Sequence, residues 1–218
     1  MSLLSILSKG GWLMIPLVII SFIAVVIIVE RYIVIKKSKL NVPAFLVKIR
    51  GMLIKKDISG AMSYCIEEKS SAANIIKSGL KKYHLGQERV KESIENAGRQ
   101  EVAKLEKGLT VVATIAGIAP LIGFLGTVTG MIQAFMRIED LQGSANPSDL
   151  AGGIWEALIT TAVGLAIGII ALGFYNYLTS AINKLVLDME VVSNDVVDII
   201  EETNSGRKVR EEDIEIEL

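Results

Sequence analysis

Thiol and imidazole side chains are almost absent from this sequence of 218 residues, which contains one cysteine, Cys65, and one histidine, His84. A single cysteine excludes an intramolecular disulfide, and neither residue stands in a spacing typical of a metal site. We therefore interpret both as ordinary residues of a helical domain. No metal ion and no cofactor is expected.

Aromatic residues are also scarce, at 6%, although 51% of the residues are hydrophobic and the mean hydropathy is +0.48. Charge is missing from residues 10–29 and 108–136, and residues 150–178 contain only Glu156. Each stretch is longer than the roughly 18 apolar residues that suggest a membrane span. Three fully buried core helices of this length would be unusual in a small soluble protein. The sequence therefore predicts an all-α integral membrane protein with three spans, the first an uncleaved anchor and not a signal peptide.

Lys and Arg are unevenly distributed, although the formal net charge is only −1. Residues 36–107 contain 16 Lys or Arg against 8 Asp or Glu, whereas the segments before the first span and between the second and third have one each, Lys9 and Arg137. Basic residues close to the spans mark the cytoplasmic side. We therefore expect the N-terminus outside and the C-terminus in the cytoplasm, and no nucleic-acid-binding face. The expected order is an outside tail (1–9), first span (10–35), cytoplasmic helical region (36–107), second span (108–136), outside loop (137–149), third span (150–178), cytoplasmic helical extension (179–204) and charged tail (205–218).

The second and third spans are expected to extend into a cytoplasmic helical bundle. Between residues 87 and 136 the only proline is Pro120, which predicts a continuous helix through that range. Residues 150–203 would form another helix, roughly 80 Å long at 1.5 Å per residue. Apolar residues at spacings of three and four beyond the third span predict a packing seam; they are Ile182, Leu185, Met189, Val192, Val196 and Ile199.

Shorter cytoplasmic helices are indicated by local start signals. Pro43 opens an amphipathic segment, and the next two helices have two candidate N-caps each. The candidates are Asp57 or Ser59 for the first of these helices and Ser70 or Ser71 for the second.

Small residues form a stripe on each of the last two spans, which predicts close helix packing in lipid. On the second span the stripe is Ala116, Pro120, Gly123, Thr127, Gly130 and Ala134, and on the third it is Gly153, Ala157, Thr160 or Thr161, Gly164, Gly168 and Ala171. Two GxxxG pairs are present, Gly126 with Gly130 and Gly164 with Gly168. The stripes fit either packing within one chain or a helix-lined oligomeric pore.

Glu156 allows two interpretations. It is either an interfacial acid near a helix N-terminus, where the helix dipole favours negative charge, or an ionisable group lining a polar pathway. Thr160 lies one turn further on, and the run lengths place Thr161 nearly level with Thr127 of the second span. A hydroxyl can also bond the carbonyl four residues earlier, so each threonine alone has a structural interpretation.

Three stretches resemble one family closely: GGWLMIPLVIISFIAVVIIVERY (10–32), APLIGFLGTVTGMIQAF (119–135) and GIWEALITTAVGLAIGI (153–169), the last followed by Tyr175 and Asn176. They are similar to the ExbB/TolQ proton-channel family, which is distantly related to MotA, and most similar to ExbB. The resemblance implies a bacterial inner-membrane motor subunit. Members form a pentamer around the single-span helices of an ExbD/TolR-type partner, and in ExbB systems proton flow energises a TonB-like protein and outer-membrane transport.

The resemblance also implies roles for individual residues. Thr127 and Thr161 match the family's threonines on the proton path, and Glu156 matches its third-span glutamate near the outer end of the pore. Thr160 and Thr129 are neighbouring hydroxyls of less defined role. The partner's essential aspartate has no counterpart here, because no Asp lies in the three apolar stretches.

Other functions remain open at this stage. The chain fits a TolQ-like or gliding-motor subunit of the same family, or a scaffold that holds a partner without conducting. An intramembrane enzyme is disfavoured because the apolar stretches hold no His, Cys or Asp. The residues do not decide between protons and sodium ions, and the resemblance favours protons.

Overall fold

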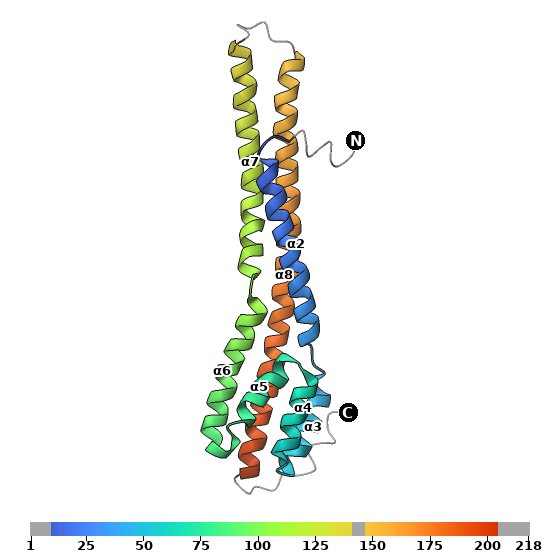
Figure 1. The fold of residues 1–218 in the computed structure, drawn as a ribbon, viewed down its shortest axis with the longest axis vertical. Coiled ribbons are helices and arrows are strands. Elements are labelled where there is room, and N and C mark those ends of the chain that lie inside the picture. Colours follow the sequence, from blue (N-terminus) through green and yellow to red (C-terminus); the bar gives the residue numbers. More distant parts are fainter. Residues whose placement is uncertain (1–9, 141–146, 205–218) are drawn as a thin grey trace. The chain divides into compact units, whose positions relative to one another are not determined.

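The computed structural model describes residues 10–140 and 147–204, which are almost entirely helical (Figure 1). The elements are α2 (Met14–Ser38), α3 (Val42–Ile54), α4 (Ile58–Glu68), α5 (Ser71–Leu80), the short 3₁₀ helix η1 (Tyr83–Leu85), α6 (Gln87–Glu106), α7 (Leu109–Asp140) and α8 (Pro147–Asn204). The predicted tails 1–9 and 205–218 and residues 141–146 of the predicted outside loop lie outside the described residues. The prediction of an all-α protein is confirmed for the described part of the chain.

The chain divides into two compact units. The first, here called the membrane unit, comprises residues 1–31 and 108–179, and the second, called the bundle unit, comprises residues 32–107 and 180–218. Helices α2 and α8 each contribute to both units.

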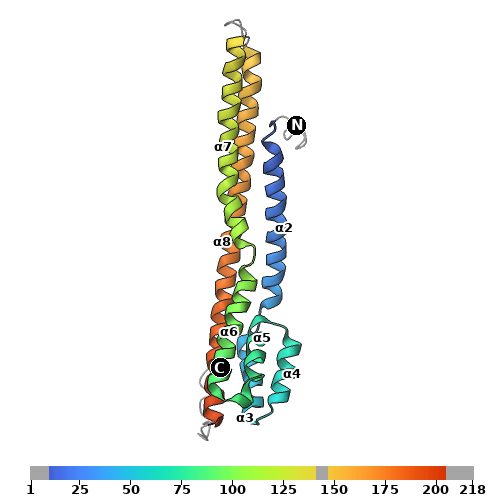
Figure 2. The same cartoon turned by 60° about the vertical axis from the view of Figure 1, so that its left-hand side comes forward.

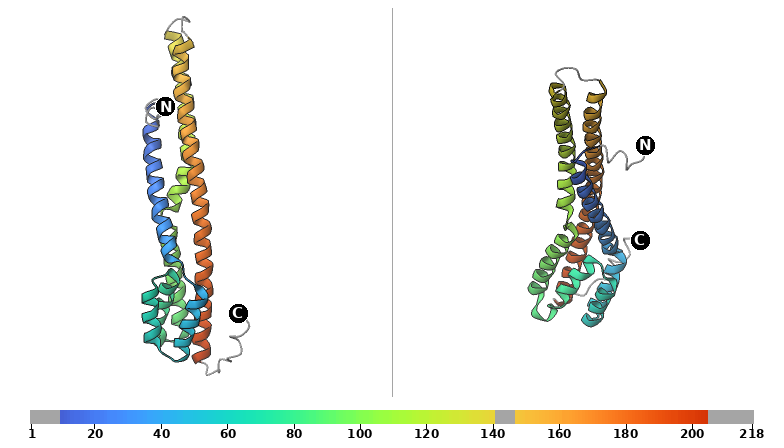
Figure 3. Two further views of the ribbon diagram at one scale, coloured as in Figure 1. Left: turned by 90° about the vertical axis from the view of Figure 1, so that its right-hand side faces the viewer. Right: turned by 45° about the horizontal axis from the view of Figure 1, so that its top comes forward.

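The membrane unit holds the apolar parts of α2, α7 and α8. In the described residues, three helices are long and apolar enough to cross a membrane, as the sequence predicts. Their apolar side chains point outward as well as inward, since Phe22, Leu121 and Ile169 are each about two thirds exposed. A helix that is apolar on every side is typical of a lipid environment. Further views show α7 and the first part of α8 side by side (Figure 3).

Helix α2 packs on the α7–α8 pair through a small apolar core. Met14 and Leu17 of α2 and Ala119 of α7 are buried together, and Val163 and Ile167 of α8 pack against them. This contact fixes the first span within the membrane unit.

The helix predicted to be continuous over residues 87–136 is interrupted, which corrects that expectation. Helix α6 ends at Glu106 and α7 begins at Leu109, and between them Gly108 has a φ of 82°. This left-handed conformation is strongly disfavoured for residues that carry a Cβ. A Cβ atom built on Gly108 would also lie 3.1 Å from Cγ2 of Ile27. Pro120 does not break α7, which continues through it to Asp140.

The bundle unit gathers α3 to α6 beside the last part of α8 (Figure 2). The caps are Asn41, Asp57 and Ser70, whose side-chain oxygens accept from the backbone N–H groups of Ala44, Gly60 and Ala73. The alternatives Ser59 and Ser71 lie inside their helices. The predicted seam on α8 is confirmed, because all six of its apolar residues are buried.

Candidate functional site

Helices α7 and α8 contact each other backbone to backbone in the membrane unit. A Cβ atom built on Gly164 would lie 2.5 Å from the carbonyl oxygen of Ala119 and 2.9 Å from Cα of Gly123. One built on Gly123 would lie 3.1 Å from both the Thr160 carbonyl oxygen and Cα of Thr161. The helices can approach this closely only because neither glycine carries a side chain.

The same close contact continues on both sides of Gly123. Gly130 lies against Ala157, Gly126 lies against the side chain of Thr160, and Gly168 lies against Pro120. The two predicted stripes of small residues therefore face each other within one chain, with Gly126 in the buried row and Thr127 at its edge. The stripes therefore have a packing role within this chain.

Thr161 and Thr127 hydrogen-bond to neighbouring carbonyls of one α7 turn. The Thr161 hydroxyl donates to the carbonyl oxygen of Gly123 at 2.7 Å, across the helix pair. The Thr127 hydroxyl donates to the carbonyl oxygen of Phe124 at 2.6 Å. Gly123 is four residues before Thr127, the usual acceptor position for a threonine in a helix. The Gly123 carbonyl oxygen thus accepts a hydrogen bond from Thr161, and the next carbonyl oxygen, that of Phe124, accepts one from Thr127. The structure brings these two predicted residues together.

The side chain of Thr160 lies against Gly126 of α7 and also reaches the segment that precedes α2. Its hydroxyl is within 2.8 Å of the carbonyl oxygen of Gly10 and within 2.9 Å of the carbonyl oxygen of Glu156. One hydroxyl carries one proton, so it donates to one of these two acceptors at a time. The residue is 1% exposed. Thr160 therefore links the start of the first span to α8.

Glu156 lies with Thr160 and Thr129 around a cavity of about 10 Å³. Among the described residues, its lining comprises Gly10, Trp12, Leu13, Gly126, Thr129, Gly130, Gln133, Glu156 and Thr160. The Glu156 carboxylate also approaches Gly11, whose φ is 68°, so closely that a Cβ atom there would overlap it. The Thr129 hydroxyl lies 3.0 Å from the carbonyl oxygen of Leu125 and 3.2 Å from that of Gly126, both in its own helix, and donates to one of them at a time.

Five residues in or beside this cavity were not predicted: Gly10, Trp12, Leu13 and Gln133 line it, and Gly11 lies against the Glu156 carboxylate. Gly10 and Gly11 could have been identified from the sequence, because a pair of glycines at the start of an apolar helix allows a non-helical backbone and close approach of other groups. The sequence indicated Gln133 more weakly, because it is the only side-chain amide in an apolar stretch of 29 residues.

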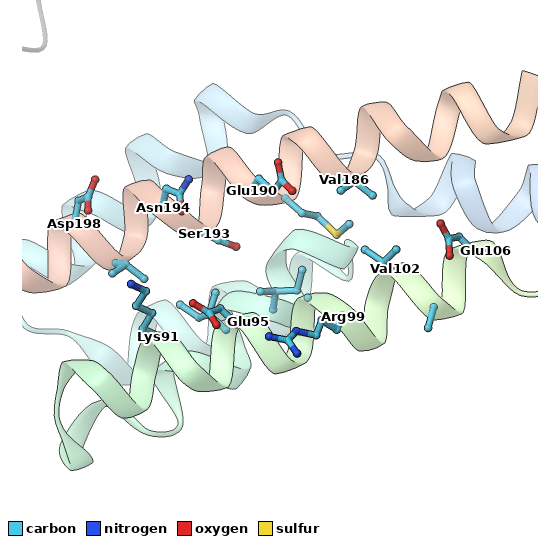
Figure 4. Close-up of a pocket in the computed structure, with 16 residues that line it drawn as sticks. Lys91, Glu95, Arg99, Val102, Glu106, Val186, Glu190, Ser193, Asn194 and Asp198 are labelled. Atoms are coloured by element: carbon cyan, nitrogen blue, oxygen red, sulfur yellow. The ribbon is translucent and has the colours of Figure 1, made fainter.

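A second hollow, of about 830 Å³, lies in the bundle unit between α6 and α8 (Figure 4). Its walls include apolar side chains such as Val102, Val186 and Met189. Helix α6 contributes both basic side chains, Lys91 and Arg99, and acidic ones, Glu95 and Glu106. Helix α8 contributes the acidic side chains of Glu190 and Asp198. Within the described residues, no group of three or more His, Cys, Asp or Glu side chains is placed to hold a metal ion.

Comparison with known proteins gives results consistent with this geometry. A model of the MotA/TolQ/ExbB proton channel family matches residues 67–191. A protein of Methanothermobacter thermautotrophicus named as a homologue of the biopolymer transport protein ExbB is 29% identical over 72% of this chain and 55% of its own. The biopolymer transport protein ExbB of Xanthomonas campestris pv. campestris is 33% identical over 56% of this chain and 46% of its own. The chain thus spans about half the length of these relatives.

A structural comparison adds evidence on the fold. One chain in a solved structure of C. jejuni MotAB aligns with a TM-score of 0.62, at 20% identity, over 84% of this chain and 74% of that chain. At this identity the likeness shows a shared fold.

Proposed function

The chain belongs to the MotA/TolQ/ExbB proton channel family, and from this membership we propose that it is the ExbB-like subunit of a motor complex driven by the proton motive force. In this proposal it lies in the bacterial inner membrane with its N-terminus in the periplasm and its C-terminus in the cytoplasm. The excess of Lys and Arg in residues 36–107 supports that orientation.

The hydroxyl pair of Thr161 and Thr127 carries the proposal. Both hydroxyls donate to adjacent α7 carbonyls, and each oxygen keeps lone-pair capacity to accept a further hydrogen bond. Such groups pass or hold protons without carrying a fixed charge, which would be costly in a membrane. Two of them on one turn, from two helices, give a short polar step in apolar surroundings.

A complete pathway requires a partner. The three apolar stretches contain no Asp, so we propose that an ExbD/TolR-type single-span helix supplies the titrating carboxylate. Five copies of this chain would surround the partner helices, and a TonB-like protein would receive the work. A TolQ-like or gliding-motor role would use the same machinery with a different recipient.

Two other classes of function have less support. A non-conducting scaffold needs only the glycine contacts and gives no reason for two hydroxyls on one turn. An enzyme would need a nucleophile beside a base, and the cavity around Glu156 is lined by neither His nor Cys. We therefore propose a non-enzymatic role.

The proposal is tested by purifying the chain with an ExbD-type partner and measuring proton entry into liposomes that contain a pH-sensitive dye. We expect flux that depends on both subunits and stops when the proton gradient is collapsed. Native mass spectrometry of the same sample would give the subunit ratio. A complex that assembles fully but passes no protons would support the scaffold instead.

A further inference from the structure

The hollow between α6 and α8 has two walls whose register is set by one hydrogen bond. The Gln87 side-chain amide donates to the Glu201 carboxylate at 2.8 Å, which joins the start of α6 to the last turn of α8. The two helices run in opposite directions (Figure 1). Residues equally far from this bond, one after Gln87 and one before Glu201, therefore lie level with each other, because both helices rise by about 1.5 Å per residue.

This register places opposite charges across the hollow from one another. Lys91 is four residues beyond the bond on α6, and Asp198 is three residues before it on α8. Arg99 and Glu190, two turns further on, are twelve and eleven residues from the same bond. All four side chains line the hollow, and Figure 4 shows them in this order.

The walls also match between and beyond these charged pairs. Glu95 is level with Asn194, whose amide can donate to a carboxylate, and Val102 is level with Val186. Glu106, the remaining charged residue of the lining, lies past the last of these pairs. Agreement over four successive positions is typical of two surfaces that meet each other. A site for a third element requires each wall to match that element instead.

The matching charges stand apart in this structure. Between described residues, no ion pair or hydrogen bond links Lys91 or Arg99 to an acidic side chain of α8. The volume between the walls is about 830 Å³. The attraction between opposite charges rises as their separation falls, and the apolar side chains of the walls are stabilised when they leave water. Both effects favour approach of the two helices.

Helix α6 is attached at its ends in a way that allows such an approach. One end is held by the Gln87–Glu201 bond, and at the other the chain passes through Gly108, where the φ of 82° separates α6 from α7. Residues at the ends of elements are the usual hinges of a moving helix. Helix α5 stays with α6, because the Ser93 hydroxyl donates to the Ser78 carbonyl oxygen at 2.8 Å.

We propose that the hollow is the open state of a closing device, in which α6 swings toward α8 about its two ends. Closing brings Lys91 to Asp198 and Arg99 to Glu190, and it covers the valines of both walls. The bundle unit then has an open and a closed state, whose balance depends on ionic strength. The inference goes beyond the proposed function, because it concerns the bundle unit and holds whether or not the chain conducts protons.

The experiment measures the distance between α6 and α8 in the purified full chain in lipid nanodiscs. Spin labels are attached after Gln100→Cys and Val191→Cys, at exposed positions that do not line the hollow, in a Cys65→Ala background. The labelled chain is mixed with excess unlabelled chain before reconstitution. Double electron–electron resonance should show two distances. The shorter one should lose population between about 0.1 M and about 1 M salt, because the Debye length falls from about 10 Å to about 3 Å.

A charge exchange tests the pairing directly. Arg99→Glu places two acids level with each other and should abolish the shorter distance, whereas Arg99→Glu combined with Glu190→Arg should restore it. Arg89→Glu is the matched control, because Arg89 is an exposed basic residue of α6 that does not line the hollow. It should leave both populations unchanged. The salt titration needs no substitution in the hollow, so it stands even where Arg99→Glu does not fold.

Three results would overturn the proposal. A single distance that responds neither to salt nor to the charge exchange would mean that the hollow does not close. A shorter distance that is absent when labelled chain is diluted with unlabelled chain would mean that α6 of one copy meets α8 of another. Loss of the shorter distance after replacement of Arg207, Lys208 and Arg210 by glutamine would mean that residues 205–218 occupy the hollow.

Discussion

The hydroxyl of Thr161 on α8 reaches the carbonyl oxygen of Gly123 on α7 at 2.7 Å. That carbonyl is four residues before Thr127, so the two threonines depend on one helical turn. Thr127 donates to the next carbonyl oxygen of that turn, that of Phe124, at 2.6 Å. Both hydroxyls therefore depend on the same turn of α7 for their positions.

This dependence predicts that Thr161→Val and Thr127→Val each abolish proton flux in the complex with its partner. Valine has nearly the shape of threonine, so the loss of one hydrogen bond costs only about 0.5–1.5 kcal/mol of stability. Flux into dye-loaded liposomes and thermal unfolding measure the two effects. Thr114→Val is the matched control, because Thr114 bonds its own helix through the Thr110 carbonyl and is exposed. Normal flux in both site variants would remove the hydroxyls from the pathway.

A second prediction concerns the close contact of α7 with α8. Gly164→Ala places a methyl group 2.5 Å from the Ala119 carbonyl oxygen, so the helices must separate, at a cost of about 1–3 kcal/mol for overpacking. Gly173→Ala on the same helix meets nothing within 4 Å, and we expect it to be neutral or stabilising by roughly 0.5–1 kcal/mol. Thermal unfolding in detergent compares the two. Equal melting temperatures would show that the helices are not packed this closely.

The turn before α2 gives a third prediction. Gly11→Ala meets both an unfavourable φ, with a cost of about 1–2 kcal/mol, and the Glu156 carboxylate. Gly86→Ala meets an unfavourable backbone conformation alone, since Gly86 has a φ of 95° and a ψ of 164° and a Cβ atom there would meet nothing within 4 Å. We expect Gly11→Ala to be the more destabilising of the two.

A double-mutant cycle separates the contact from the backbone strain. Glu156→Ala shortens the side chain, so Gly11→Ala should cost less in that background than in the wild type. Additive losses of stability would mean that the carboxylate does not lie against Gly11.

A fourth prediction concerns Cys65 in the bundle unit. Burial raises the pKa of its thiol to about 11 from an ordinary value of 9.0; Glu68 adds to the rise, and Lys77 opposes it. Between these two values the folded chain binds the thiol proton more tightly than the unfolded chain does. The contribution to stability is therefore complete below pH 9 and declines as the pH rises toward 11.

This pH dependence is measured by chemical unfolding of the wild type and Cys65→Ala at pH 7.5, 9 and 10.5. The wild type should lose stability relative to the variant only across the alkaline interval. Iodoacetamide should label the thiol at pH 8 only after unfolding, because the folded thiol is buried and protonated. Rapid labelling of the folded chain at pH 8 would contradict the burial of Cys65.

Much of the fold followed from residue patterns whose cause is local. The apolar stretches predict the spanning helices because backbone groups in lipid must bond within their own segment. The seam from Ile182 to Ile199 predicts a buried face because three- and four-residue spacings place side chains on one side of a helix. The cap at Ser70 follows from its hydroxyl, which satisfies a free N–H group at the helix start.

The interruption at Gly108 was not anticipated, although the sequence carried a signal for it. Glycine just after a lysine-containing last turn is a common helix end, but the absence of proline favoured continuity. The break between α6 and α7 results from the positive φ of a single residue, Gly108. The composition of the neighbouring sequence does not determine that angle.

The candidate site was only partly predictable. Depth counting along two helices placed Thr161 near Thr127, and the structure joins them through Gly123. Depth counting did not predict the cavity beside Glu156. That cavity forms because residues 10–13 pack against α8, which lies some 150 positions later in the chain. Contacts of this kind follow from tertiary packing and leave no periodic trace.

The hydrogen bond from Thr160 to Gly10 also has a consequence for the surrounding lipid. Helix α2 has 25 residues, about 37 Å at 1.5 Å per residue, slightly more than a hydrocarbon core of roughly 30 Å. Trp12 precedes it and Lys36 and Lys37 close it, residue types that favour the two membrane–water boundaries. Because Thr160 holds its start against α8, the first span cannot slide to suit a thinner bilayer. A mismatch between the length of α2 and the bilayer thickness must then be met by tilting of the helices or by deformation of the bilayer. The protein should therefore favour membranes of matching thickness.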